Sequence, residues 1–347
     1  MKRRATSLAL AVLLVAGCAG VGEPKPGAPP HHRTRGFVNS NPGFERPGFW
    51  TVQRFRLSRL VDTFAARRPV PDFPRADNDG RALRANTLAP TLTWIGHATF
   101  LFQVDGLNVL TDPQWSERAS PLSFAGPRRL SLPGVRFEDL PRIDVVLISH
   151  DHYDHLDRAT VSRLARVHRP LFLVPLGLKA WFADIGVTNV EELDWWQRRV
   201  VGAVTFTCVP VQHWAARTPF DMNRRLWSGW ALVGRHRRAF FAGDTGYYAP
   251  GFRAIGERLG PFDVAAVAIG AYDPPEMMRM THTTPEESLD IFADVRARTF
   301  VAMHWGTFDL AEEPLDEPPR RLREAAKARG IPDNHVWILQ HGETRPW

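Results

Sequence analysis

The chain has 347 residues, of which 44% are hydrophobic and 23% charged, and its formal net charge at pH 7 is +7. This composition is that of an ordinary globular protein, and the length allows one large domain with an N-terminal extension. After the first 20 residues, no apolar run reaches the roughly 18 residues that a membrane-spanning helix needs. The basic residues are scattered along the chain, which argues against nucleic acid as a partner.

The first residues have the pattern of a bacterial signal peptide. A basic start at Lys2–Arg4 is followed by the apolar run Leu8–Val15 and by small residues ahead of Cys18. This ending resembles the lipobox of bacterial lipoproteins, in which the signal is removed and the cysteine is lipidated. We therefore expect residues 1–17 to be the signal and Cys18 the lipid anchor, with an ordinary secretory signal as the alternative. Ala19, in place of an aspartate, favours a location in the cell envelope on the outer membrane, facing the periplasm.

The composition of the chain changes near residue 86. Residues 18–85 are expected to form a lipid-anchored linker and N-terminal extension, because 19–48 are rich in proline and glycine. The arginine-rich segment 49–89 is expected to contribute a helix that lies on the body, and 86–347 form the main domain. Cys208 lies in an apolar run and is expected in the core, so no intramolecular disulfide forms if Cys18 is lipidated.

From Thr91 onward, short β-rich runs alternate with helical patterns. Asp105-Gly106 between two such runs predicts a tight hairpin, and Thr284, Pro285 and Glu287 form a capping box at the start of a helix. The expected strands are Thr91–Ile95, Phe100–Val104, Asn108–Thr111, Val145–Ile148, Leu171–Val174, Val204–Val211, Gly229–Val233, Ala239–Ala242, Val264–Ile269 and Phe300–Met303. The expected helices are Arg158–Val167, Leu178–Ala183, Pro285–Val295 and Pro319–Arg329. Two groups of strands with helices after each predict the α/β class and an αββα sandwich, with two mixed β-sheets flanked by helices.

A cluster of histidines and aspartates follows one of these strands. His150, His152, Asp154 and His155 come directly after the apolar run Val145–Ile148, where a strand ends and a loop begins. Alternation lets the two imidazoles at 150 and 152 point the same way, while Asp154 and His155 turn toward a second position. Zinc takes imidazole and carboxylate ligands at about 2.0–2.2 Å, so a compact run of such side chains indicates a metal site.

Further ligands are available at the ends of later strands. His213, Asp244 and His304 each follow a β-rich run, on the side where the first cluster lies. Together, five histidines and two aspartates allow two metal ions about 3.5–4 Å apart, with one carboxylate bridging and a hydroxide shared between them. Nitrogen-rich ligands favour two zinc ions per chain, and iron and manganese stay open because geometry and availability decide the metal.

Short sequence motifs spread through the chain indicate a particular family. They are WIGHA at 94–98, LTDP at 110–113, RASP at 118–121, GPRR at 126–129, GDTGY at 243–247, GPFD at 260–263, IGAY at 269–272 and HWGTF at 304–308. Through these motifs, the chain from about Thr91 to Gly342 resembles the N-acyl-phosphatidylethanolamine-hydrolysing phospholipases D of the metallo-β-lactamase superfamily.

The resemblance implies a role for each residue of the site. It assigns the ligands to two zinc ions: His150, His152 and His213 to the first, and Asp154, His155 and His304 to the second, with Asp244 bridging. It also implies that His282 is an active-site histidine near the substrate, so that Asp154 and His282 are the catalytic side chains. The shared hydroxide would attack phosphorus in N-acyl-phosphatidylethanolamine or a related phospholipid, giving phosphatidic acid and an N-acylethanolamine.

Substrate contacts are less defined in the sequence. Five tryptophans are candidates for an acyl-chain groove: Trp195, Trp196, Trp214, Trp227 and Trp230. Arg128 and Arg129 are candidates for a phosphate contact, although a solvated loop is the simpler interpretation. The expected partners are a phospholipid substrate and the membrane that holds the anchor, and a homodimer stays open.

Two other functions remain open. The same metals would polarise the carbonyl of a lactone equally well, so a lactonase or another phosphodiesterase is the first alternative. The second is a lipid-anchored envelope protein with a vestigial metal site. All seven ligand positions are filled, which disfavours a vestigial site.

Overall fold

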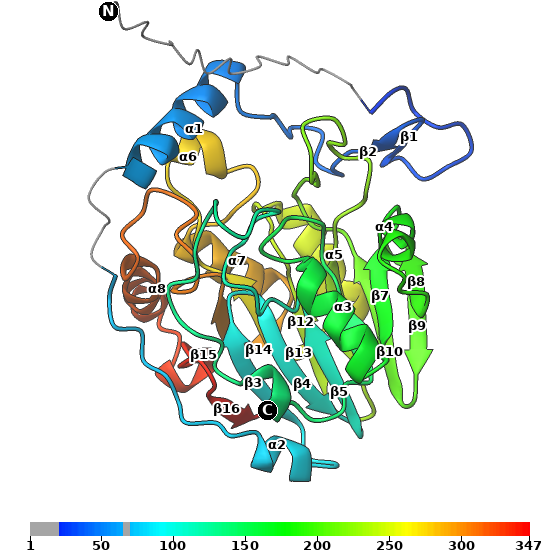
Figure 1. The fold of residues 1–347 in the computed structure, drawn as a ribbon, viewed down its shortest axis with the longest axis vertical. Helices are drawn as coiled ribbons and strands as arrows, with labels where there is room; N and C mark the ends of the chain where they lie inside the picture. The colour runs from blue at the N-terminus through cyan, green and yellow to red at the C-terminus, as the bar shows by residue number, and fades with distance from the viewer. Residues whose placement is uncertain (1–20, 65–69) are drawn as a thin grey trace, which may run out of the picture.

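A computed structural model describes residues 21–64 and 70–347, so the expected signal 1–17 and Cys18 lie outside the described residues. The described chain forms two seven-stranded β-sheets with helices on their outer faces (Figure 1). This arrangement confirms the predicted αββα sandwich. Within the described ranges, no helix is long and apolar enough to cross a membrane.

The first sheet has the strand order β16-β3-β4-β5-β6-β7-β8. Its strands are β3 (Thr91–Gly96), β4 (Thr99–Val104), β5 (Leu107–Thr111), β6 (Val145–Leu147), β7 (Leu171–Pro175), β8 (Val190–Leu193) and β16 (Thr344–Pro346). Strands β3 to β5 pair antiparallel, and β5 to β8 pair parallel. The turn between β4 and β5 is made by Asp105 and Gly106, whose φ angles of 49° and 80° are those that an Asp-Gly hairpin turn requires.

The second sheet has the order β15-β14-β13-β12-β11-β10-β9. Its strands are β9 (Arg198–Val201), β10 (Val204–Val209), β11 (Gly229–Val233), β12 (Arg238–Phe241), β13 (Phe262–Ala268), β14 (Ala297–Met303) and β15 (Val336–Trp337). Strands β9 to β12 pair antiparallel, and β12 to β15 pair parallel. Each sheet is therefore mixed, as predicted.

Some of the helices cover the outer faces of the sheets, and others lie at the ends of the sandwich (Figure 1). The helices are α1 (Phe49–Phe64), α2 (Arg81–Ala85), α3 (Arg158–Val167), α4 (Lys179–Asp184), α5 (Ala249–Leu259), α6 (Pro275–Met278), α7 (Pro285–Asp294) and α8 (Glu317–Ala328), with 3-10 turns at Phe137–Asp139 and Asp333–His335. The period of two in β6 sorts its side chains: Val146 packs with Val161 and Leu164 of α3, whereas Val145 and Leu147 belong to the core between the sheets. Continuous apolar strands such as β6 are thus buried on both faces.

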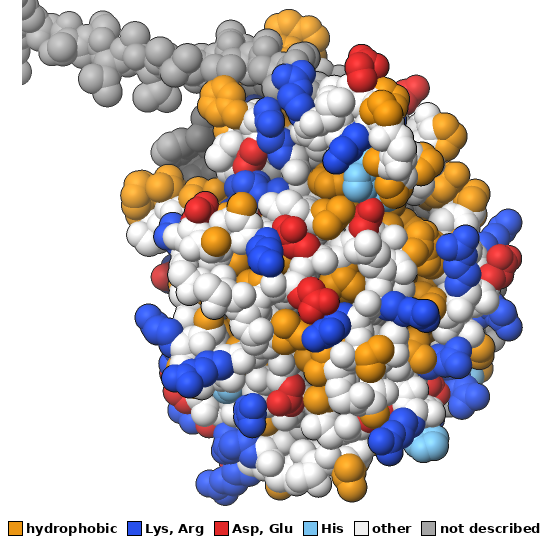
Figure 2. Space-filling model, turned by 90° about the vertical axis from the view of Figure 1, so that its right-hand side faces the viewer, with side chains coloured by type: hydrophobic (Ala, Val, Ile, Leu, Met, Phe, Trp, Pro, Cys, Tyr) orange, Lys and Arg blue, Asp and Glu red, His pale blue; other side chains and the backbone are white. Residues whose placement is uncertain are grey.

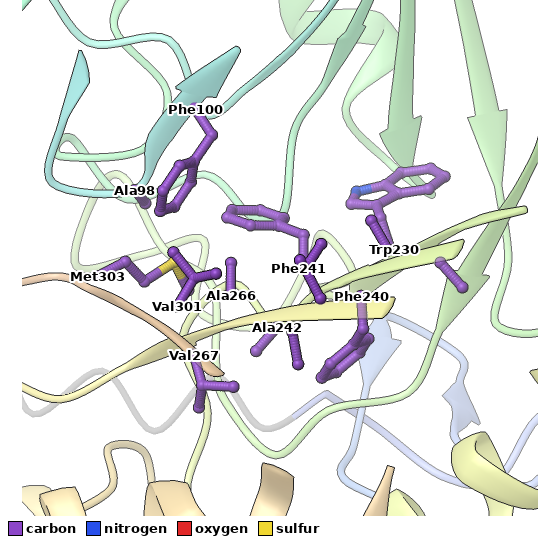
Figure 3. Packing of buried hydrophobic residues seen from close by; sticks show 14 of the residues in the cluster. Ala98, Phe100, Trp230, Phe240, Phe241, Ala242, Ala266, Val267, Val301 and Met303 are labelled. Carbon is purple, nitrogen blue, oxygen red and sulfur yellow. The ribbon is translucent and has the colours of Figure 1, made fainter. Parts of the chain in front are cut away.

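The core between the sheets is rich in aromatic side chains. Figure 3 shows Phe100 of β4 facing Phe241 of β12 across the gap, with Trp230 of β11 beside Phe241 and Phe240 on the opposite side of its strand. All four of these side chains are fully buried. This packing holds the two sheets together and fixes the strand ends from which the loops emerge.

The predicted helices agree with the structure to within a few residues, and α7 begins with the predicted capping box of Thr284 and Glu287. Helices α5 and α6 and the edge strands β8, β9, β15 and β16 were not predicted from the sequence. Helix α5 contains Pro250, Gly251 and Gly256, which obscure its periodicity. Gly256 is required there, because a Cβ atom at this position would lie 2.3 Å from the carbonyl oxygen of Asp294 at the end of α7.

The N-terminal extension contacts the main body. Strands β1 (His32–Arg33) and β2 (Gly36–Phe37) form a small antiparallel hairpin, and α1 supplies the helix expected within 49–89. Figure 1 shows the hairpin and α1 at the same end of the sandwich as the loops that follow β10 and α6. On the face drawn in Figure 2, basic side chains are dispersed with acidic ones between them and form no continuous stripe.

Candidate metal centre

The predicted cluster lies at the end of β6, in the loop that leads to α3. Hydrogen bonds from the main-chain N–H groups of His155 and Leu156 to the carbonyl of His152 curl this loop back on itself. Asp157 then caps α3, because its carboxylate accepts from the N–H of Ala159. The tight loop brings side chains at 150, 152, 154 and 155 to one place.

A first group of nitrogen atoms comes from three histidines. The Nε2 atom of His150 lies 2.9 Å from Nδ1 of His152, and Nε2 of His213 lies 3.3 Å from the same Nδ1. His213 arrives from the segment that follows β10. The three atoms have the spacing of ligands around one ion.

A second group combines a carboxylate with imidazoles. The Oδ2 atom of Asp154 lies 3.3 Å from Nε2 of His155 and 3.4 Å from Nε2 of His304, which follows β14. The same carboxylate oxygen lies 2.8 Å from Nε2 of His97. These side chains form a second cluster with ligand spacing.

Asp244, which follows β12, lies between the two groups. Its Oδ2 atom is 3.1 Å from Nε2 of His155 and 3.2 Å from Nε2 of His304. It is also 4.0 Å from Nε2 of His150 and 3.9 Å from Nε2 of His213. The structure therefore brings all seven predicted ligands together, with Asp244 in the position of a bridge.

The site fits a pair of metal ions because several of its buried polar atoms have no hydrogen-bond partner in residues 21–64 and 70–347. They include Nε2 of His155, Nε2 of His304 and Oδ1 of Asp244. Such atoms are costly to bury unless a ligand satisfies them. Five imidazoles and two carboxylates suit a transition-metal ion such as zinc better than calcium or magnesium. The role of each residue as a ligand stays a prediction.

Hydrogen bonds behind the histidines fix their rings. His155 donates through Nδ1 to Oδ2 of Asp112 at 2.7 Å, and His213 donates through Nδ1 to the carbonyl of Thr281 at 2.9 Å. Asp112 also accepts from the main chain and the hydroxyl of Ser149. Such outer contacts orient the nitrogen that faces a metal. Asp112 belongs to the sequence motif LTDP at 110–113, but its role behind His155 was not predicted from the sequence.

The electrostatics divide the site into two halves. Burial on its own raises the pKa of Asp154 and Asp244, but the surrounding imidazoles outweigh it, and both pKa values lie well below the usual range of an aspartate. Burial lowers the pKa of His304, but the two carboxylates outweigh it and raise the value to about 9. Burial holds the pKa of His150 and His213 well below 6.5. Metal ligands bind deprotonated, so a cation at the carboxylate half would displace protons from imidazoles there.

Two further histidines border the cluster. Burial, together with the neighbouring His304, lowers the pKa of His97 to about 3, so its ring is neutral and donates through Nε2 to Asp154. Burial likewise lowers the pKa of His282 to about 4. The Nδ1 atom of His282 lies 3.9 Å from Oδ2 of Asp244 and has no hydrogen-bond partner among the described residues. His282 also lies within ligand spacing of His213 and Asp244.

The expected acyl-chain groove is wrong for three of its five tryptophans. Trp195, Trp227 and Trp230 are core residues, and their indole N–H groups donate to main-chain carbonyls, which for Trp230 is that of Ile148 at 2.9 Å. The other two, Trp196 and Trp214, are partly exposed. Trp214 lies at the site, with its ring centroid 4.3 Å from that of His152.

The expectation of a solvated loop holds for one of the two arginines. Arg128 is exposed and pairs with Glu117. Arg129 is largely buried, donates to the carbonyl of Gln114 at 2.5 Å, and lies 5.0 Å from the ring centroid of Phe308. Arg129 therefore supports the loop beside the centre rather than standing in solvent.

A cavity of about 740 Å³ opens on the outer side of the ligand loop, and none of the seven candidate ligands lines it. Tyr153, Leu156 and Asp157 of the loop border it, together with Trp181 and Arg217. The guanidinium of Arg217 covers the ring of Tyr153 at 4.0 Å. The cavity is thus separated from the ligand atoms by the loop itself.

Comparisons with known proteins identify the family of the chain. The family described as beta-lactamase superfamily domain matches residues 107–305. An N-acyl-phosphatidylethanolamine-hydrolyzing phospholipase D 1 of Caenorhabditis elegans is 44% identical over 72% of this chain and 74% of its own. An uncharacterized protein of Mycobacterium tuberculosis is 42% identical over 87% of this chain and 81% of its own. A mitochondrial N-acyl-phosphatidylethanolamine-hydrolyzing phospholipase D of Saccharomyces cerevisiae is 34% identical over 70% of this chain and 53% of its own.

Solved structures share the fold. Igni18, a metallo hydrolase from Ignicoccus hospitalis, superposes with a TM-score of 0.57 at 21% identity, over 75% of this chain and 98% of its own. An isothiocyanate hydrolase from Delia radicum gut bacteria superposes with a TM-score of 0.59 at 22% identity, over 74% of this chain and 99% of its own. At such identities the likeness concerns the fold alone. The sequence relatives and the matched family together place the chain: it belongs to the metallo-β-lactamase superfamily of hydrolases, in the family of the N-acyl-phosphatidylethanolamine-hydrolysing phospholipases D.

Proposed function

We propose that this protein is a binuclear zinc phosphodiesterase that cleaves N-acyl-phosphatidylethanolamine or a related phospholipid in the manner of a phospholipase D. The observation that carries the proposal is the complete set of seven ligand side chains, with Asp244 between the two groups. The names of the relatives from Caenorhabditis elegans and Saccharomyces cerevisiae support the choice of substrate.

Two zinc ions in this site would supply a water-derived nucleophile near neutral pH and would balance charge on phosphoryl oxygens. The protein's own contribution is to hold the donors in place. His97 keeps Asp154 turned toward His304, and Asp112 keeps the ring of His155 directed inward. These fixed contacts lower the reorganisation that the reaction requires.

His282 is the best candidate for a proton-handling group that is not a ligand. Its ring is buried and neutral, and its Nδ1 atom has no partner among the described residues. A neutral imidazole can donate a hydrogen bond to a phosphoryl oxygen or pass a proton to a leaving alkoxide. The distance of 3.9 Å between its Nδ1 atom and Oδ2 of Asp244 supports a role for this ring near the reacting phosphate.

The activity can be tested with purified protein whose metal content has been measured by mass spectrometry. We expect two zinc ions per chain and release of phosphatidic acid and an N-acylethanolamine from N-acyl-phosphatidylethanolamine. A panel of lactones serves as the competing substrate class. Turnover of lactones with no phospholipid cleavage would replace the proposal with the lactonase alternative, and a different resident metal would overturn only the zinc assignment.

We further propose that the protein is held at a bacterial membrane through a lipid on Cys18, facing the periplasm from the outer membrane. The support is the apolar run Leu8–Val15 and the small residues before Cys18. Expression of the full chain in a Gram-negative host tests this. The wild type should fractionate with outer membranes and Cys18→Ser with the soluble periplasm or the unprocessed precursor, and identical fractionation of the two would refute the anchor.

A further inference from the structure

The main chain of the candidate ligand His213 is held by a single side chain from the N-terminal extension. The Oδ1 atom of Asn39 accepts from the N–H of His213 at 3.0 Å, and its Nδ2 atom donates to the carbonyl oxygen of His213 at 2.8 Å. These are the hydrogen bonds that the described residues offer to the His213 main chain. A primary amide thus pairs with His213 as a neighbouring strand would, although the two residues are 174 positions apart.

The residue before His213 is also contacted by the extension, in this case through its side chain. Asn41 donates through Nδ2 to Oε1 of Gln212 at 2.7 Å. Gln212 in turn donates through Nε2 to the carbonyl of Met280 at 3.0 Å, close to the carbonyl of Thr281 that orients the His213 ring. The extension therefore reaches the ligand through two adjacent residues of the segment after β10.

The extension is itself fastened to the body next to this contact. His31 and His32 both bond through Nε2 to Asp194, at 2.7 and 2.8 Å, and the ring of His31 stacks on Trp195 with a centroid distance of 4.2 Å. We call this contact of His31, His32 and Asp194 the histidine clasp. Phe37 is buried and packs on the main hydrophobic cluster, so residues on both strands of the hairpin contact the body.

Close backbone packing completes the attachment. The N–H of Phe37 donates to the carbonyl of Asn223 at 2.9 Å, and a Cβ atom on Gly36 would lie 2.2 Å from that carbonyl oxygen. Asn223 donates through its N–H to the carbonyl of Ala215 and accepts through its side chain from the N–H of Ala215. The segment 213–223 is thereby pinned to the extension at both of its ends.

We propose that Asn39 is a positioning residue of the metal centre and that segment 31–41 of the extension is a structural part of it. The side chain of His213 is fixed at Nδ1 by Thr281 and its main chain by Asn39, and together these contacts set where Nε2 lies relative to His150 and His152. Contacts behind a ligand typically change metal affinity about 10- to 100-fold when they are removed. The proposal rests on the metal centre of the proposed function and not on its substrate.

Two substitutions of Asn39 separate hydrogen bonding from packing. Asn39→Ala removes both bonds, whereas Asn39→Asp keeps the size and the acceptor but replaces the donor with an oxygen that repels the His213 carbonyl. Asn86→Ala is the matched control, because Asn86 also bridges loop segments by its amide, to Ala89 and Gln103, but lies away from the centre.

The readout is zinc binding by the full-length protein, measured by chelator competition, with the absorption spectrum of the cobalt-substituted protein as a second signature. We expect Asn39→Ala and Asn39→Asp to lower the affinity for one of the two zinc ions about 10- to 100-fold and to change the cobalt spectrum. The affinity for the other ion and the Tm should stay close to those of the wild type. Asn86→Ala should bind both ions as the wild type does.

Wild-type affinity for both ions in Asn39→Asp would overturn the positioning role, because it would show that shape alone suffices. An equal fall in the affinity for both ions, together with a lower Tm, would also overturn the positioning role and would indicate general destabilisation. The proposed function fails separately, if the wild type binds two zinc ions but leaves phospholipid uncut.

Discussion

The Nε2 atom of His97 lies 2.8 Å from the Oδ2 atom of Asp154, and the His97 side chain is buried whereas that of Asp154 is partly exposed. His97 adopts a left-handed backbone conformation with a φ of 54°, and its N–H donates to the hydroxyl of Thr307. A non-glycine residue in this region is costly and persists only where its surroundings hold it. This strained backbone conformation directs a neutral imidazole toward the candidate ligand Asp154.

Removal of this imidazole should loosen Asp154 and weaken the binding of the zinc ion proposed for this half of the site. For His97→Ala, we expect a fall of about 10- to 100-fold in affinity for one zinc ion and a similar fall in kcat/KM. Chelator competition and phospholipid turnover measure the two effects. His236→Ala, at an exposed position far from any ligand, is the control and should leave both quantities unchanged.

His282 should behave differently from a ligand. If its ring handles protons rather than holding a metal ion, His282→Ala should keep two zinc ions while kcat falls by about 10²- to 10⁴-fold. His304→Ala should instead lose zinc, since its Nε2 atom lies 3.2 Å from Asp244. Metal analysis alongside turnover separates the two, and loss of zinc from the His282 variant would assign that residue to the ligands.

The histidine clasp predicts a pH-dependent contribution to stability. Burial raises the pKa of Asp194, but hydrogen bonds from His31, His32 and the main chain of Trp195 outweigh this and leave the pKa below its usual value. A carboxyl whose folded pKa is lowered stabilises the fold above its unfolded pKa of about 4 and loses that contribution as the pH falls through the folded value.

Urea unfolding of Asp194→Asn and wild type measures this contribution. The free-energy difference between the two should be largest near pH 7 and should shrink below about pH 4. A difference that stays constant from pH 7 to pH 3 would mean that the charge of Asp194 plays no part in the clasp.

Close packing of α5 against α7 predicts an asymmetric response to alanine. Gly256→Ala should destabilise the protein by about 1–3 kcal/mol, because its Cβ would lie 2.3 Å from the carbonyl oxygen of Asp294. Gly251→Ala in the same helix would meet only the Tyr248 ring, at 3.3 Å, and gain helix propensity. Urea unfolding should therefore separate the two variants clearly, and equal free energies of unfolding would contradict the predicted helix contact.

The sequence was most informative where local pattern and burial coincide. The candidate ligands between His150 and His155 lie close together in one loop. The strands β6 and β7 are continuous apolar runs, and β13 is apolar from Val264 onward. Both the ligand loop and these strands could therefore be predicted without knowledge of the fold. The strand β9 was missed because its arginines are exposed at a sheet edge, where pairing rather than burial defines the strand. Local apolar pattern alone gives no signal for such edges.

Contacts between distant segments were beyond the sequence. The register of β11 directs Trp230 into the core, where its indole N–H donates to the carbonyl of Ile148. The sequence shows a tryptophan but not this direction, so the prediction of an acyl-chain groove at Trp230 was wrong. Asn39 lies in a segment whose prolines and glycines predict a linker, yet it pairs with His213 across 174 positions. The significance of a single amide at that distance depends on tertiary structure, which pattern and propensity do not encode.

The most direct test of the central claim is to follow the oxygen that is added during cleavage. Zinc-loaded protein is incubated with N-acyl-phosphatidylethanolamine in water enriched in oxygen-18, and the products are weighed by mass spectrometry. Attack at phosphorus predicts phosphatidic acid that carries one heavy oxygen, together with an unlabelled N-acylethanolamine. Label in a released fatty acid, or an intact phospholipid beside hydrolysed lactones, would contradict the assignment of this centre to a phosphodiester.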